Sequence, residues 1–220
     1  MTFASRVIEW QKAHGRHHLP WQNTGDAYRV WLSEVMLQQT QVATVIPYYL
    51  RFIERFPDVQ ALATAPLDAV LAAWAGLGYY SRARLLHRCA QQVVQLHAGR
   101  FPRAAAPLEA LPGIGRSTAA AIAVFAGGAR AAILDGNVRR VLARHFGVEG
   151  FPGSRVTQVE LWRIAERELP HDDVAAYTQG LMDLGATVCT RSRPRCDACP
   201  VRATCVALRD GRIAELPAPR

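Results

Sequence analysis

Helical periodicity dominates the hydrophobic pattern of this chain. Apolar side chains recur three or four residues apart from Phe3 to about His14, a spacing that places them on one face of an α-helix. The same pattern follows Asp26, a favourable N-cap, and predicts a second helix from Ala27 to about Val45. No segment shows the apolar and polar alternation of a strand. The sequence therefore predicts an all-α protein.

Proline and capping residues divide the rest of the chain into further predicted helices. Pro47 is expected to break the long helix or to begin the next one. Thr157 with Glu160 has the spacing of a capping box, and Asp172 or Asp173 is expected to begin the helix after it. The other predicted helices cover residues 58–64, 66–75, 82–98 and 137–146, and residues 211–220 are interpreted as a tail or linker.

Two glycines, Gly113 and Gly115, predict a tight turn that opens a helix of small apolar residues. A helix N-terminus presents backbone N–H groups and the positive end of the helix dipole, so such a turn can bind a phosphate. Asp135 follows about one helix and one loop later. Simpler interpretations are an ordinary turn between helices and, for Asp135, an N-cap of the following helix.

Polar residues also recur at helical spacing. Glu34 and Gln38 lie on one face of the helix predicted from Ala27, and taken alone this stripe favours a solvated surface. Gln39 adds another amide that could reach nucleic acid bases. A second glycine turn, residues 75–84, places Tyr79 beside arginines. That combination suits stacking on a nucleic acid, or a tyrosine that closes the edge of a core.

Composition narrows the class of protein. Half of the 220 residues are hydrophobic, but no run of eighteen apolar residues occurs, so we expect no membrane-spanning segment. No signal peptide pattern is present, and a cytoplasmic location is expected. The net charge of +8 suits a polyanionic partner. Lys12 is the only lysine, so Schiff-base chemistry has one candidate.

Four of the five cysteines are spaced Cys-x6-Cys-x2-Cys-x5-Cys near the end of the chain. In a protein expected to be cytosolic, and with such short loops, this spacing favours a metal site over disulfides. Four thiolates suit tetrahedral zinc or a [4Fe–4S] cluster. Arginines on the same segment could contact phosphates, at positions 191, 193, 195 and 202.

Together these motifs resemble the helix-hairpin-helix superfamily of base excision DNA glycosylases over nearly the whole chain, and within it the adenine DNA glycosylase (MutY) family. The resemblance implies two helical lobes with a DNA cleft between them: a six-helix barrel over 27–136 and a cluster lobe over 1–26 plus 137–210. Five stretches carry it: Leu19-Pro20-Trp21, Val30–Gln41, Gly76–Tyr80, Leu134–Val138 and Met182–Gly185.

By this resemblance, Glu34 is the acid that protonates the departing adenine. Asp135 stabilises the positively charged sugar, and Asn137 helps to orient the site. Bifunctional relatives carry a lysine where this chain has Ser117, so the resemblance implies an enzyme that leaves the DNA strand intact.

The resemblance also assigns DNA and cluster contacts. Gln39 and Tyr79 are expected to wedge into the base stack and Gln179 to contact adenine. The full set comprises Gln38, Gln39, Tyr79, Gln179, Gly113 and Gly115 for DNA, and Cys189, Cys196, Cys199 and Cys205 for a [4Fe–4S] cluster.

The expected function is removal of adenine mispaired with 8-oxoguanine or guanine in double-stranded DNA, by a monomer that binds no membrane. The family usually carries a carboxy-terminal domain that helps to recognise 8-oxoguanine. These 220 residues hold no counterpart of that domain, so we expect a weaker preference for 8-oxoguanine. Two alternatives stay open: a thymine/guanine mismatch glycosylase of the same superfamily, and a non-catalytic DNA-binding iron–sulfur module.

Overall fold

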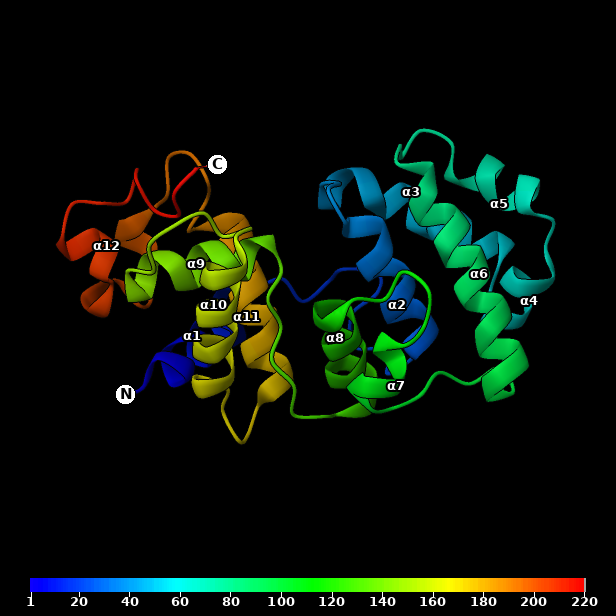
Figure 1. Cartoon of the computed structure of the whole chain (residues 1–220), viewed down its shortest axis with the longest axis horizontal. Coiled ribbons are helices and arrows are strands. Elements are labelled where there is room, and N and C mark those ends of the chain that lie inside the picture. The colour runs from blue at the N-terminus through cyan, green and yellow to red at the C-terminus, as the bar shows by residue number, and fades with distance from the viewer. Residues whose placement is uncertain (220) are drawn as a thin grey trace. The chain divides into compact units, whose positions relative to one another are not determined.

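Helices account for all regular secondary structure in the computed structural model, which describes residues 1–219 (Figure 1). No strand occurs in this range, so the predicted all-α class is confirmed. Within the same range, no helix combines the length and the apolar character needed to cross a membrane.

The helices form two units, each described here by itself. One unit, His17–Ala129, contains the helices of the first half of the chain. They are α2 (Ala27–Leu37), α3 (Val42–Arg55), α4 (Val59–Thr64), α5 (Leu67–Trp74), α6 (Tyr80–His97), α7 (Ala105–Glu109) and α8 (Arg116–Gly127). We call it the α2–α8 unit.

The other unit joins Met1–Arg16 to the chain from Arg130 onward, and we call it the α1/α9–α12 unit. Its elements are α1 (Phe3–His14), α9 (Gly136–Phe146), α10 (Arg155–Arg167), α11 (Val174–Thr187), the 3-10 helices η1 (Cys196–Ala198) and η2 (Arg202–Thr204), and α12 (Val206–Arg209). Asp135 belongs to this unit, whereas the predicted lobes placed it with Glu34. The reason is that Asp135 caps α9, which packs against α10, α11 and α12.

Large apolar side chains fill the interior of the α2–α8 unit. Trp31, Phe52, Trp74 and Leu86 are at most 1% exposed and come from four different helices. Burying each such side chain contributes about 1.5–3 kcal/mol. Helix α2 contacts α3, α6 and α8, so its backbone is held from several sides.

Close helix contacts organise the α1/α9–α12 unit. Helix α11 packs against both α1 and α9. A Cβ added to Gly185 would lie 2.6 Å from the Cβ of Asn137, and one added to Gly180 would lie 2.8 Å from Val7. Glycine is therefore required at these two positions of α11. The close approach at Gly185 fixes where the first turn of α9 lies against α11.

The prediction of one long helix over residues 27–45 is wrong, because the structure has two helices in this range. Helix α2 ends at Leu37 and α3 begins at Val42, with Gln39 in the left-handed region (φ 59°) between them. Arg82 donates hydrogen bonds to carbonyl oxygens at the end of α2, including that of Val35, and so stabilises the break. Pro47 lies inside α3, after the break that it was expected to cause.

Two other local predictions are corrected. Ser154, not Thr157, caps α10, and Thr157 lies in the first turn. The predicted tail is packed in part, since Leu216 is 3% exposed. The prediction that Asp172 or Asp173 begins the next helix is confirmed. Asp173 is the N-cap residue of α11, although it is left-handed and makes no side-chain capping bond, and its carboxylate pairs with Lys12.

Candidate functional site

Glu34 is a half-buried carboxyl side chain on a helix whose neighbouring positions are all buried. Trp31, Leu32, Ser33, Val35 and Met36 are at most 5% exposed. The packing of these side chains holds the α2 backbone, and therefore the point from which Glu34 projects. Gln38 lies one turn further, at the C-cap of the same helix, and is also half-buried.

The predicted glycine turn is present before α8. Gly113 has φ +77°, a conformation that favours glycine, and an added Cβ would lie 3.0 Å from the Cβ of Leu85. Gly115 is the N-cap of α8 with φ −89° and has open space around its Cβ position. Neither strain nor crowding within the protein explains this second glycine. Its exposed backbone at the positive end of a helix dipole can be approached closely by an anion such as phosphate. Ser117 lies half-buried in the first turn of α8.

Asp135 is the N-cap of α9, which confirms the simpler of its two interpretations. Its Oδ1 accepts a hydrogen bond from the Val138 N–H at 2.7 Å. Burial raises the pKa of Asp135, while the N–H groups of Val138 and Asn137 and the guanidinium of Arg140 oppose that shift. A cap also fixes the direction of its carboxylate, so the capping role is compatible with a catalytic one.

Asn137 and Arg140 link the first turn of α9 to the cysteine segment. Arg140 Nη2 donates to Asn137 Oδ1 at 2.8 Å and to the Gly185 carbonyl at 2.7 Å, and its Nε donates to the Cys189 carbonyl at 2.7 Å. The orientation of the Asn137 amide is thus set by a side chain that also contacts the first of the four clustered cysteines.

Gln39 and Tyr79 are both exposed and both left-handed, with φ of 59° and 48°. They lie in the α2–α8 unit, at the α2–α3 break and immediately before α6. Non-glycine residues seldom adopt this conformation, and exposed strained residues are found preferentially at functional sites.

Gln179 is half-buried on α11, where its Nε2 donates to Asp183 Oδ1 at 2.8 Å. Asp183 is fully buried and also accepts hydrogen bonds from the backbone and side chain of Arg16. Because a carboxylate only accepts hydrogen bonds, the amide nitrogen of Gln179 faces Asp183 and its carbonyl oxygen is left as an acceptor.

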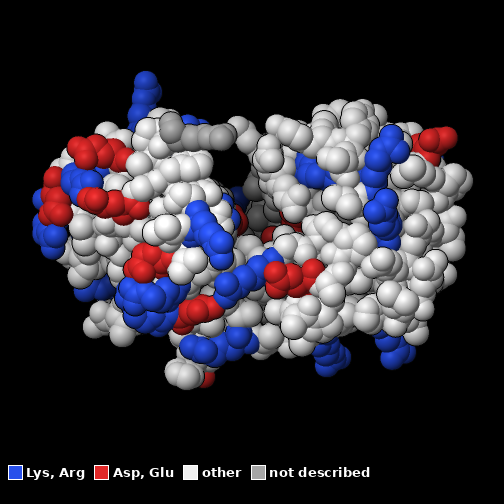
Figure 2. Space-filling model, viewed as in Figure 1, with Lys and Arg blue, Asp and Glu red and all other residues white. Residues whose placement is uncertain are grey.

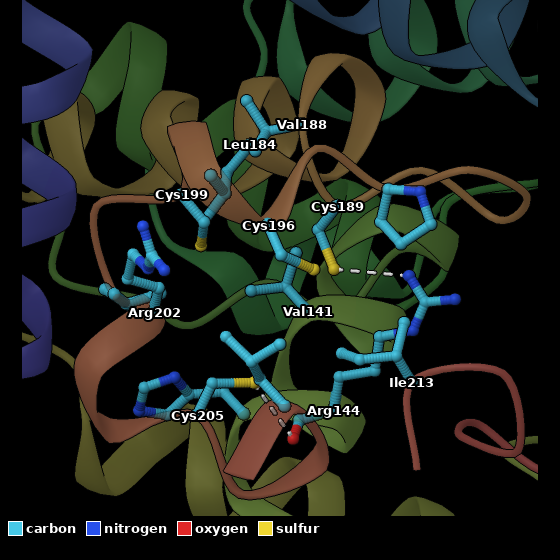
Figure 3. Close-up of a pocket in the computed structure, with 14 residues that line it drawn as sticks. Val141, Arg144, Leu184, Val188, Cys189, Cys196, Cys199, Arg202, Cys205 and Ile213 are labelled. Atoms are coloured by element: carbon cyan, nitrogen blue, oxygen red, sulfur yellow. Dashed lines mark hydrogen bonds between the residues drawn. The ribbon is translucent and has the colours of Figure 1, made fainter. Parts of the chain in front are cut away.

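The four clustered cysteines line a single pocket in the α1/α9–α12 unit. Figure 3 shows their side chains reaching this cavity from the loop after α11, η1 and the segment before α12. Arg144 Nη1 lies 3.5 Å from the Cys189 sulfur. The remaining lining is mostly apolar, and burial raises the pKa of the Cys199 thiol to about 11. The apolar residues of the lining include Val141, Leu184, Val188, Val201, Leu208 and Ile213.

This pocket suits a metal centre by its donor chemistry. All four cysteines are free thiols, and together they provide the sulfur ligands that zinc or an iron–sulfur cluster uses. As the side chains are placed in residues 1–219, however, no three potential ligands stand close enough to hold a single metal ion.

The predicted residues divide between the two units. Those in the α2–α8 unit are Glu34, Gln38, Gln39, Tyr79, Gly113, Gly115 and Ser117, while Asp135, Asn137, Gln179 and the four cysteines lie in the other. Charge does not mark a site on the face shown in Figure 2, where basic side chains are scattered over both units.

Sequence reasoning missed Arg140 and Arg144, whose side chains contact Asn137 and Cys189. It included Arg82, in the glycine turn over 75–84, and Asp183, in the stretch Met182–Gly185, but not their contacts with Gln38 and Gln179. Arginine is so frequent in this chain that the presence of Arg140 and Arg144 alone carried no signal. Helical spacing could have indicated Arg140 and Arg144, which lie four residues apart on a helix next to Asp135.

Comparison with known proteins identifies a family and several relatives. Residues 32–167 match the family model described as "HhH-GPD superfamily base excision DNA repair protein". The chain is 40% identical over 216 residues to the adenine DNA glycosylase of Buchnera aphidicola subsp. Baizongia pistaciae, covering 98% of this chain and 61% of that protein. It is 44% identical over 215 residues to the human adenine DNA glycosylase, covering 94% of this chain and 39% of that protein. The chain thus spans about three fifths or less of the length of these relatives.

Two solved structures share the fold. A thermostable thymine-DNA glycosylase matches with a TM-score of 0.85 and 28% identity, covering 94% of this chain and 95% of that one. A non-covalent endonuclease III–DNA complex matches with a TM-score of 0.77 and 20% identity, covering 96% and 99%. At 20% identity, the match to the endonuclease III complex shows only that the helical fold is shared.

Proposed function

The chain belongs to the HhH-GPD superfamily of base excision DNA repair proteins, and we propose that it is a monofunctional DNA glycosylase that removes mispaired adenine. Its substrate in this proposal is double-stranded DNA with adenine opposite 8-oxoguanine or guanine. The observation that carries the choice of adenine is the 40% and 44% identity, over nearly the whole chain, to proteins named adenine DNA glycosylase.

The two carboxyl side chains have distinct parts in the proposed reaction. An adenine within a duplex must first be flipped out of the stack, which costs roughly a few kcal/mol. Glu34 then donates a proton to the adenine ring, because the neutral base leaves more readily than its anion. The glycosidic bond breaks, the sugar becomes positively charged, and the Asp135 carboxylate stabilises that charge. Water completes the hydrolysis and leaves an abasic site.

Strand cleavage is not part of the proposal. A lyase of this superfamily uses a lysine as nucleophile, and this chain has Ser117 in the hairpin. Its one lysine, Lys12, pairs with Asp173 at 2.6 Å on the surface of the α1/α9–α12 unit. A side chain held in a surface ion pair is a poor candidate for the nucleophile.

DNA contacts are proposed for the exposed turns. The backbone at Gly113 and Gly115 binds a phosphate next to the α8 N-terminus. Gln39 and Tyr79 enter the base stack around the flipped nucleotide. Gln179 offers its carbonyl oxygen to the exocyclic amine of adenine, an acceptor position that its contact with Asp183 supports. Gln38 directly precedes Gln39 in the chain and is proposed to contact the same DNA.

We also propose that the four cysteines hold a [4Fe–4S] cluster. Their shared, largely apolar pocket supports this assignment, as does the Cys-x6-Cys-x2-Cys-x5-Cys spacing. The cluster would stabilise the loop between α11 and α12, on which Arg191 and Arg193 are exposed for contacts with phosphates. It has no part in the chemistry of base removal.

A thymine/guanine mismatch glycosylase is the second candidate. One observation favours it: the structure of the thermostable thymine-DNA glycosylase matches this chain with a TM-score of 0.85. It is placed second because its identity to this chain is 28%, below the 40% and 44% of the two adenine DNA glycosylases.

A single-turnover excision assay tests the proposal. Duplexes carry adenine opposite 8-oxoguanine, adenine opposite guanine, or thymine opposite guanine, and each product is read with and without alkali. We expect strand breaks at adenine only after alkali. Glu34→Gln should lower the rate by at least about 100-fold, the lower range for a general acid, while DNA binding is retained.

The same assay separates the alternatives. Excision at thymine would establish the mismatch enzyme instead. Binding without any excision by the wild-type protein would indicate a non-catalytic module. Borohydride trapping of the protein on DNA would contradict the monofunctional assignment.

A further inference from the structure

Arg82 is a buried arginine whose guanidinium contacts backbone carbonyls instead of a carboxylate. It is 8% exposed on the first turn of α6. Nη1 donates to the carbonyls of Val35 and Met36, each at 3.0 Å, and to that of Gln38 at 2.6 Å. Val35 and Met36 belong to the last turn of α2 and Gln38 is its C-cap, where carbonyls have no partner within the helix. Arg82 therefore ends α2 and turns the chain outward at Gln38.

The same guanidinium reaches a second segment. Nη2 donates to the carbonyls of Leu77 and Gly78 at 3.3 and 3.4 Å, and to Thr40 Oγ1 at 3.2 Å. The guanidinium carbon also lies 5.4 Å from the centre of the Tyr79 ring, which suits a cation–π contact. One side chain thus joins the α2–α3 break to the turn before α6.

These contacts flank Gln39 on both sides and lie directly before Tyr79. Gln39 lies between Gln38 and Thr40, both bonded to Arg82, and Tyr79 follows directly after Gly78. Gln39 and Tyr79 are exposed, and neither is a residue type that favours this conformation. Such strained conformations persist only where the surroundings hold them. Arg82 supplies that constraint for both residues together.

We propose that Arg82 is a positioning residue for DNA opening, which holds Gln39 and Tyr79 as one rigid two-point wedge. This inference rests on the proposed function, because it assigns the wedge to flipping of the target base. A wedge that is already ordered loses little conformational freedom when it enters the stack, so more of its contact energy is available to unstack the base. Arg82 itself touches neither the base nor the sugar.

The test compares substrates that differ in the cost of unstacking. Excision is measured in single turnover on a duplex with adenine opposite guanine, and on the same strand with the adenine in an unpaired bubble. Arg82→Met should lower the rate on the duplex about tenfold or more, and on the bubble less than about threefold, because the bubble adenine is already unstacked.

Two further variants complete the design. Arg82→Lys keeps the charge but lacks the planar fork that serves six acceptors, so it should restore the duplex rate only in part. Arg88→Met changes an exposed arginine on the same helix and should leave both rates unchanged. Equal losses on duplex and bubble for Arg82→Met and Arg82→Lys would overturn the proposal, since damage to the fold affects both substrates alike.

A fluorescence measurement keeps this inference separate from the proposed function. 2-Aminopurine at the target position brightens when it leaves the stack, and this needs no bond cleavage. Wild-type protein should brighten it on binding, and Arg82→Met should bind without that increase. Wild-type protein that cleaves neither substrate would contradict the glycosylase assignment alone. Equal brightening by both proteins would overturn the role of Arg82.

Discussion

At the scale of single residues, buried charge lies next to the side chains proposed to act on DNA. Arg82 contacts the segments of Gln39 and Tyr79, Asp183 orients Gln179, and Asp135 is itself a candidate catalytic group. Burying a charged group is unfavourable unless hydrogen bonds compensate it. Such groups are concentrated at functional sites, and here each buried charge has defined partners.

Asp135 leads to a prediction about stability and pH. Burial raises its pKa, so the folded protein binds this proton more tightly than the unfolded chain. The ionised carboxylate then lowers stability at neutral pH, and this penalty disappears as pH falls through the raised pKa toward the ordinary value of 3.8. Asp135→Asn keeps a capping side chain, so it should raise the melting temperature at pH 7, by roughly 2–4 °C per kcal/mol gained.

Thermal melting of the DNA-free protein at several pH values checks this expectation. The gain in melting temperature from Asp135→Asn should shrink as the pH is lowered. A variant that is less stable than wild type at every pH would show that the carboxylate contributes more as a cap than it loses through burial.

At the scale of the elements, the turn before α8 uses two glycines for different reasons. Gly113 has a positive φ and a close neighbour in Leu85, so the fold requires it. Gly115 has an ordinary φ and an open Cβ position, so the fold does not. A glycine that the fold does not require, exposed at a helix N-terminus, indicates close approach by a ligand.

The two glycines therefore give a matched pair of variants. Gly113→Ala should destabilise the protein by about 1–2 kcal/mol, because alanine is strained at a left-handed position. Gly115→Ala should lower the melting temperature by no more than about 2–4 °C, because alanine is a poorer N-cap than glycine but also restricts the unfolded chain. It should nevertheless weaken DNA binding, measured by titration with a labelled duplex. Unchanged affinity would contradict a phosphate contact at Gly115.

At the scale of the whole molecule, the chain builds two separate sets of packed helices. The core of the α2–α8 unit includes Trp31 and Trp74, whereas in the other unit α9 and α11 pack against each other and line the cysteine pocket. The first and last parts of the chain thus share one unit, and the helices between them in sequence belong to the other.

Loss of the proposed cluster should therefore affect the two units unequally. Cys199→Ser should reduce the bound iron and sulfide and the visible absorbance of the protein. It should also speed amide hydrogen exchange in α9 and α11, whose side chains Val141 and Leu184 line the pocket. Exchange in α2 and α6 should change little. Equal acceleration in both units, or wild-type protein that binds zinc in place of iron, would contradict this picture.

Local spacing explains what could be predicted from the sequence. The all-α class, the glycine turn, the cap at Asp135 and the grouping of the four cysteines all depend on residues close together in the chain. The resemblance to the superfamily rests on the same short stretches, and the family match confirms it. Roles proposed for Glu34, Asp135 and the other site residues stay predictions until the variants are measured.

Only the tertiary structure decided where the chain breaks and which polar groups meet. The α2–α3 break depends on Arg82, more than forty residues away along the chain, and the orientation of Gln179 depends on a carboxylate also bound by Arg16. Asp135 belongs to the α1/α9–α12 unit because α9 packs against α11, and no local pattern encodes that contact. Short-range signals specify helices and turns, whereas the partners of buried charges are set by packing between distant segments.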